Sequence, residues 1–112
     1  MTGQPSVLAD SPLPHRVQLR RLKGWRMPEG TVKVDRSTRW GNPFRATGHT
    51  PEQVVAAFRD WITEAHTVQA WDMRRDAQAL LRGRNLACWC RLDQPCHADV
   101  LLDLANADPG RT

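Results

Sequence analysis

All three cysteines of this 112-residue chain lie within ten positions, in residues 88–97, which read CWCRLDQPCH. Residues 85–90 (NLACWC) are short and apolar and follow a glycine, which predicts a buried strand. A turn is expected over 91–95, and a helix is expected from 96 to 106, where apolar residues recur at helical spacing. The cluster therefore constrains this part of the chain to a strand, a short loop and a helix that begins at the last cysteine.

The rest of the chain predicts further strands and helices around this unit. Residues 16–22 and 31–35 alternate polar and apolar side chains, which favours strands. Thr50, followed by Pro51 and Gln53, predicts the start of a helix with a capping box. A second helix is expected over 69–82, and its inward residues are predicted to be Trp71, Ala77, Leu80 and Leu81.

This order of elements predicts the fold class. Strands, two helices, a strand and a last helix are typical of a small α/β or α+β domain, with a short sheet of about three to four strands and about three helices. A chain of this length forms one domain. We expect residues 1–15 to be a flexible lead-in, 16–106 to be the domain, and 107–112 to be a frayed tail.

Composition bears on the compartment and on the partners. No apolar run reaches the length of a membrane span, and the first residues do not resemble a signal peptide, so a cytoplasmic protein that does not contact membranes is expected. Thiols stay reduced there, and three cysteines cannot all pair, so a disulfide is the least expected arrangement.

The net charge is +4, and all but two of the basic residues are arginines, which suit phosphate groups. An anionic small molecule or nucleic acid is a candidate partner, although the arginines would also be explained as a solvated surface. Nothing in the sequence indicates an oligomeric state.

The cysteine cluster admits three interpretations. A helix that begins at Cys96 presents free N–H groups that lower a thiol's pKa, so Cys96 is expected to be a nucleophilic thiolate and His97 to carry its proton. Alternatively, Cys88, Cys90, Cys96 and His97 together hold zinc, although the spacing C-x-C-x5-C-H differs from the usual paired zinc knuckles. In the third interpretation Cys88 and Cys90 only fill the core, because free cysteine is often buried, and this interpretation is favoured for Cys88.

A second motif, DRSTRWGNPF (35–44), follows the strand predicted over 31–35. Its Asp35 is a candidate base or nucleophile, its arginines are candidate phosphate donors, and its tryptophan offers a stacking surface. The interpretation without a ligand is a structural loop, since these are also ordinary turn residues. The candidate ligand-binding residues are Arg36, Arg39, Trp40, Gly41 and Asn42, together with Cys90 from the cysteine cluster.

The two motifs are expected to meet. In open α/β sheets, ligands bind at the carboxyl ends of the strands. If the strands 31–35 and 85–90 are parallel neighbours, Asp35, Arg36 and Asn42 will lie in the same cleft as Cys90, Cys96 and His97.

Three segments also resemble a known family: VDRSTRWGNPF (34–44), the helical segment 58–61, and LACWC…PCHADVLLDLAN (86–106). Together they resemble the bacterial and phage family known as domain of unknown function 4326, over roughly residues 16–106. The resemblance implies a bacterial or phage origin and no particular activity.

These observations predict a function in outline. We expect a small enzyme that acts on a nucleotide or another phosphate-bearing molecule by hydrolysis or group transfer, with Cys96, His97 and Asp35 as catalytic residues and without a metal or cofactor. No dinucleotide or P-loop fingerprint is present. The alternative is a nucleic-acid-binding or interaction module, stabilised by zinc at the cysteine cluster.

Overall fold

The computed structural model describes residues 13–45 and 47–107. Its sheet contains three parallel strands, β1 (Arg16–Gln18), β2 (Thr31–Lys33) and β3 (Asn85–Cys88). The order across the sheet is β1-β3-β2, so the strand that comes last in the sequence lies in the centre. Leu86 and Ala87 of β3 are fully buried, as the central strand of a parallel sheet requires.

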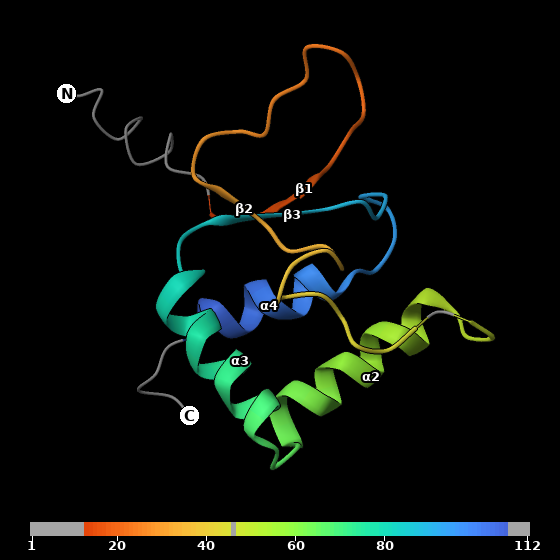
Figure 1. The fold of residues 1–112 in the computed structure, drawn as a ribbon, viewed down its shortest axis with the longest axis vertical. Coiled ribbons are helices and arrows are strands. Elements are labelled where there is room, and N and C mark those ends of the chain that lie inside the picture. The colour runs from red at the N-terminus through yellow and green to blue at the C-terminus, as the bar shows by residue number, and fades with distance from the viewer. Residues whose placement is uncertain (1–12, 46, 108–112) are drawn as a thin grey trace.

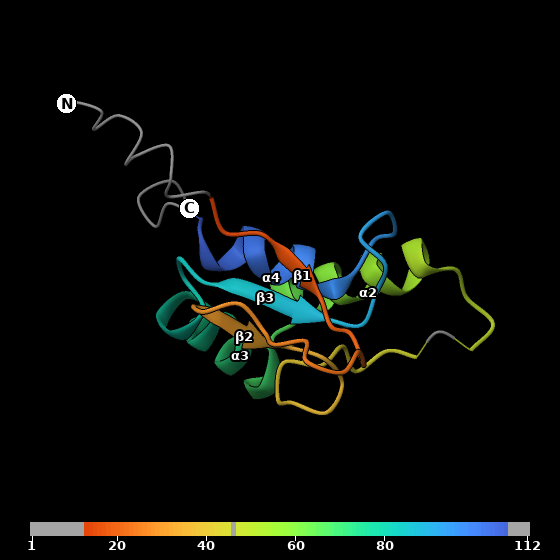
Figure 2. The same ribbon diagram turned by 90° about the horizontal axis from the view of Figure 1, so that it is seen from above.

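Three helices cover one face of this sheet: α2 (Pro51–Glu64), α3 (Val68–Leu80) and α4 (His97–Ala105). α4 packs directly against β3 and β1, and α2 and α3 pack against α4. Figure 1 shows the sheet from its edge with α4 beneath it and the other two helices below α4, and Figure 2 shows the three strands side by side with the helices behind them. The helical layer therefore meets the sheet through the helix that follows the cysteine cluster.

The helix starts follow from local side-chain chemistry. The Thr50 hydroxyl accepts a hydrogen bond from the backbone N–H of Gln53, and the Gln53 side chain accepts one from the N–H of Thr50, which forms the expected capping box. α2 then buries Val54, Phe58 and Ile62, four residues apart along one face. The core of the domain lies between this face, α4 and the sheet.

The structure confirms the predicted α/β class, and it shortens every predicted strand. Of the four residues predicted to face inward from residues 69–82, Ala77 and Leu81 are buried as expected, but Trp71 and Leu80 are 53% and 54% exposed. The buried residues of α3 are Ala70, Met73 and Ala77, so its apolar face is rotated from the predicted one, and small residues rather than the tryptophan allow α3 to pack closely on α4. Most of the predicted lead-in and tail lies outside the described residues. Over the described ranges, no helix is both long and apolar enough to cross a membrane.

Candidate functional site

The segments that follow β2 and β3 meet at one edge of the sheet, because these two strands are parallel neighbours. The backbone N–H of Val34 continues the pairing with a hydrogen bond to the carbonyl of Ala87. One residue later, Oδ2 of Asp35 accepts a hydrogen bond of 2.8 Å from the indole Nε1 of Trp89. The two sequence motifs are therefore in direct contact.

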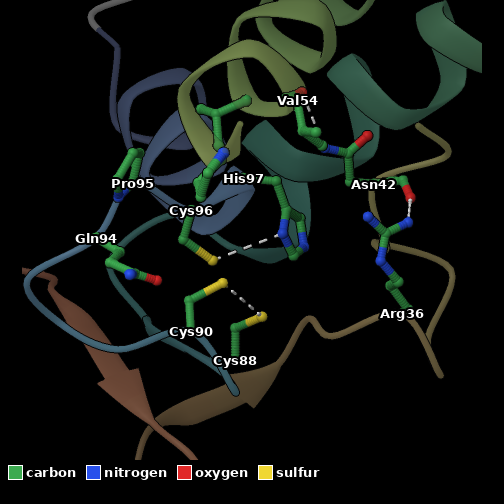
Figure 3. A pocket seen from close by; sticks show the side chains of 11 residues that line it. Arg36, Asn42, Val54, Cys88, Cys90, Gln94, Pro95, Cys96 and His97 are labelled. Atoms are coloured by element: carbon green, nitrogen blue, oxygen red, sulfur yellow. Dashed lines mark hydrogen bonds between the residues drawn. The ribbon is translucent and has the colours of Figure 1, made fainter. Parts of the chain in front are cut away.

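A pocket of about 210 Å³ lies where the motifs meet. Arg36 and Asn42 line it from the first motif, and the cysteine cluster lines it with both polar and apolar neighbours (Figure 3). The structure thus brings together five of the six residues expected in one cleft and leaves out Asp35. The rest of the lining includes Cys88, which the sequence offered as a candidate zinc ligand. It also includes residues that the sequence did not single out as site residues: Pro51, Val54, Val55, Gln94 and Pro95.

The sulfur atoms and one histidine nitrogen form a compact donor cluster. Cys88 Sγ lies 3.9 Å from Cys90 Sγ, and Cys96 Sγ lies 3.7 Å from His97 Nδ1. The donor atoms of Cys88, Cys96 and His97 all lie within 4.8 Å of one another, and these three residues are buried. Cys90 is half-buried and stands beside Cys88 at the pocket. All three cysteines are free thiols.

His97 is fixed in one orientation. Its Nε2 lies 2.6 Å from the backbone carbonyl oxygen of Val34, and its ring stands edge-on to the ring of Phe58 at 5.6 Å. A carbonyl oxygen can only accept a hydrogen bond, so Nε2 carries the hydrogen and Nδ1 keeps its lone pair. That lone pair is on the nitrogen next to Cys96, at the centre of the cluster.

Arg16 holds the turn that joins Cys90 to Cys96. Its Nη1 lies 3.1 Å from the carboxylate of Asp99 on α4, and its Nη2 donates to three backbone carbonyls of residues 91–94, at 2.7 to 3.0 Å. The Arg16 side chain is only 8% exposed. Sequence reasoning missed this residue, because Arg16 reads as an ordinary polar member of a strand and its partners lie some 75 positions further along the chain.

Asp35 does not serve the pocket. It is buried, and its carboxylate accepts hydrogen bonds from the N–H and hydroxyl of Ser37 as well as from Trp89. Burial by itself raises the pKa of Asp35, but these hydrogen bonds and the charge of Lys33 outweigh it, so the pKa is lowered. The prediction of a catalytic base at Asp35 is corrected accordingly, because the carboxylate stabilises the loop rather than facing a ligand.

The arginines of the first motif are also engaged. Nη1 of Arg36 donates to the carbonyl of Asn42, and Nη2 donates to the carbonyl of Phe44. Arg39 forms an ion pair with Asp76 of α3 and lies over the ring of Trp40, away from this pocket. Of the two predicted phosphate donors, only Arg36 lines the pocket, and part of its guanidinium is used to brace its own loop.

The other residues of the first motif support the loop from within. Trp40 is 6% exposed and belongs to the core, so it offers no stacking surface. The Asn42 amide donates to the carbonyl of Val54 and accepts from the N–H of Phe44. A Cβ on Gly41 would lie 2.6 Å from Cα of Arg36, so this glycine allows the loop to approach itself and not a ligand.

The thiols influence one another's ionisation. Hydrogen bonds from Cys90 and Cys96 lower the pKa of Cys88, and the same contacts with Cys88 raise the pKa of Cys96. The pKa of Cys90 is raised as well, chiefly by Cys88. The neighbouring thiols therefore outweigh the helix N-terminus and raise the pKa of Cys96, contrary to the expectation of a low pKa there.

Comparison with known proteins agrees with the resemblance seen in the motifs. Neither the curated proteins nor the solved structures contain a match to this chain. The model of one family, described as domain of unknown function (DUF4326), matches residues 17–107. Since that match spans both motifs and nearly the whole chain, the protein belongs to the DUF4326 family.

Proposed function

We propose that this domain binds a zinc ion through Cys88, Cys90, Cys96 and Nδ1 of His97. The observation that carries the proposal is the orientation of His97. Its Nε2–H is bonded to the carbonyl of Val34, and its free Nδ1 is directed at the buried thiols. Histidines that ligate metals commonly donate their other ring N–H to a carbonyl or carboxylate in this way.

The distances within the cluster fit a tetrahedral site. With Zn–S bonds of about 2.3 Å and Zn–N bonds of about 2.0–2.1 Å, the edges of a tetrahedron are about 3.8 Å between two sulfurs and about 3.6 Å between sulfur and nitrogen. The separation of Cys88 and Cys90 is 3.9 Å, and that of Cys96 and His97 is 3.7 Å. Both of these edges therefore already have lengths that a bound zinc ion would require.

The surroundings of the cluster favour the same function. Arg16 orders the turn between the second and third cysteine, and Phe58 packs against the histidine ring. Such supporting contacts hold ligands in place before the metal arrives. The spacing in the sequence argued against zinc because the ligands do not come from two knuckles, but here a strand end and a helix start bring them together.

A metal-free phosphate enzyme has less support. Asp35 and Arg39 are both engaged outside the pocket, and Cys96 is almost fully buried. Among the described residues of the first motif, Arg36 remains as the one cation that lines the pocket. For these reasons we rank zinc binding above the enzyme without a metal.

The test is the metal content of the purified protein, prepared without chelators and without a histidine tag. We expect close to one equivalent of zinc per chain, and loss of that zinc in Cys88→Ser and in Cys96→Ser. His66→Gln, which changes an exposed histidine outside the cluster, is the matched control and keeps its zinc. Wild-type protein that carries no zinc, takes up none when it is offered, and has three thiols open to alkylation would rule out the site whether or not the variants fold.

A second function, binding of single-stranded nucleic acid, is favoured by the loop between β1 and β2. This loop, residues 19–30, projects from the sheet on the side opposite the helices in Figure 1. Its cations Arg20, Arg21, Lys23 and Arg26 are exposed and form no ion pair with any residue described. Arg21 also lies 4.7 Å from the centre of the Trp89 ring, which is 39% exposed. Unpaired arginines beside an accessible aromatic ring are what a single strand of nucleic acid uses.

A further inference from the structure

We infer that the fourth coordination position of the zinc site is exchangeable, with Cys90 as the displaceable ligand, and that the adjoining pocket admits a small organic oxyanion to that position. This inference rests on the zinc site proposed above. It distinguishes a site that only stabilises the fold from one that can bind and activate a ligand, because structural zinc sites are closed and catalytic ones keep an open position.

The donors of the cluster are not equivalent. Cys88, Cys96 and His97 form a mutually close and buried group, whereas Cys90, which contacts both Cys88 and Cys96, is more exposed. Cys88 is held in β3, and the other two donors are held at the start of α4. Cys90 lies beyond the end of the strand, on the bend that leads into the 91–95 turn, so it is part of neither the sheet nor a helix.

The pocket lies over these same donors. All four line it, and its walls are formed by Pro51, Val54, Val55 and Pro95. Figure 3 shows the thiol groups of Cys88, Cys90 and Cys96 turned toward one another, with the ring of His97 beside them. A ligand in this pocket would therefore have direct access to a metal held by the three buried donors.

Charge and size indicate the class of ligand. Two thiolates and a neutral imidazole neutralise a zinc ion, so an anion at the fourth position would bring one unpaired negative charge. Arg36 supplies a positive charge at the same pocket, and its guanidinium has further N–H groups beyond the two that brace the loop. The volume of about 210 Å³ is below the range of roughly 300–1,000 Å³ typical of drug-sized ligands. A small carboxylate or phosphate with a short apolar portion fits these features.

The experiment uses the full chain with cobalt(II) in place of zinc, because cobalt reports its ligands in the visible spectrum. Inorganic phosphate and propionate are the two probes, and chloride at matched ionic strength is the control. We expect at least one of the probes to change the spectrum in a saturable way and to weaken the thiolate-to-cobalt absorption as Cys90 leaves. A spectral change with phosphate, with propionate or with both shows which class of oxyanion the fourth coordination position admits.

Variants separate the ligands and the anion contact. Cys90→Ala should keep one equivalent of cobalt and bind the responding probe more tightly than the wild type, whereas Cys88→Ala and Cys96→Ala should lose the metal. Arg36→Gln should weaken the probe by roughly tenfold while cobalt remains bound, since a charge-assisted contact is removed. Arg36→Lys, which keeps the charge, should recover part of that loss. Arg45→Gln, at an exposed arginine of the same loop that does not line this pocket, should have no effect.

The outcomes are distinguishable. If the wild type binds no cobalt, the zinc site itself is wrong. If it binds cobalt but neither probe alters the spectrum of the wild type or of Cys90→Ala, the site is closed and this inference is overturned while the zinc site stands. Loss of cobalt from Cys90→Ala to the same extent as from Cys88→Ala would also overturn it, because Cys90 would then be an indispensable ligand.

Discussion

The indole of Trp89 donates a hydrogen bond of 2.8 Å to the carboxylate of Asp35, across 54 positions of sequence. Trp89 stands between Cys88 and Cys90, and Asp35 begins the loop that carries Arg36 and Asn42. This contact therefore ties the loop of the first motif to the strand end that holds the thiols. The carboxylate is buried, so it depends on this donor and on Ser37 to compensate for the loss of water.

Replacing Trp89 with phenylalanine keeps the ring and removes the donor. We expect Trp89→Phe to lower the free energy of unfolding by about 1.5–3 kcal/mol, because a hydrogen bond to a buried charged group is lost. Urea unfolding followed by circular dichroism measures this. Trp71→Phe, at a tryptophan that is 53% exposed, is the control and should stay within about 0.5 kcal/mol of the wild type. Equal effects of the two substitutions would show that the Asp35 contact is not important for stability.

The stability that Asp35 provides should depend on pH. Its pKa in the folded protein is lowered from 3.8, so the carboxylate stabilises the fold fully above that value, and this contribution is lost as the pH falls through the folded pKa. We expect Asp35→Asn to be less stable than the wild type at pH 7 and the difference to shrink as the pH falls from about 4. Urea midpoints measured between about pH 7 and about pH 3, roughly one unit below the usual pKa of an aspartate, test this.

A matched substitution separates this effect from general acid unfolding. Asp103 is paired with Arg59 on the surface, and its side chain is 70% exposed. Asp103→Asn should show almost no difference from the wild type at any pH in that range, since exposed ion pairs contribute little. A difference for Asp35→Asn that stays constant down to the lowest pH would contradict the assignment of a lowered pKa.

Arg16 should act on the metal through the turn that it holds. Lysine at this position keeps the charge but cannot bridge Asp99 and three carbonyls at once, so the 91–95 turn loosens. We expect Arg16→Lys to bind zinc about 10–100-fold more weakly, the usual effect of removing a supporting contact around a metal site. Competition against a chelating dye measures the affinity. Arg84→Lys, at an exposed arginine before β3, is the control and should leave the zinc affinity unchanged. If Arg16→Lys also left the affinity unchanged, the 91–95 turn would not depend on Arg16 for its rigidity.

The loop between β1 and β2 should make binding to single-stranded DNA depend on salt. Substituting glutamine for Arg20, Arg21 and Arg26 together should lower the slope of log affinity against log salt by about 2, since each lost phosphate contact on a single strand contributes about 0.7. Fluorescence anisotropy with a labelled oligonucleotide measures the slope. A triple variant with glutamine for Arg59, Arg75 and Arg84 carries the same net charge on other elements. If both triple variants lose the same affinity, the binding reflects general charge rather than this loop.

Short-range patterns in the sequence determined the secondary structure and the approximate place of the site. The capping box at Thr50 and the apolar run before Cys88 depend on neighbours a few positions away, and both are present in the structure. The convergence of the two motifs followed from a general property of parallel sheets, because the ends of neighbouring parallel strands meet at one edge. The motifs themselves were sufficient to identify the family.

The tertiary structure alone decided what each polar side chain does. Asp35 and Arg36 carry groups suited to catalysis and phosphate binding. In the folded chain, however, the carboxylate of Asp35 accepts a hydrogen bond from Trp89, and the guanidinium of Arg36 donates one to the carbonyl of Phe44. The Nδ1 of His97 is directed at the thiols because its Nε2 meets the carbonyl of Val34, 63 positions away. A buried polar group must find a partner to offset the loss of water, and which partner it finds depends on segments that only the folded chain brings together.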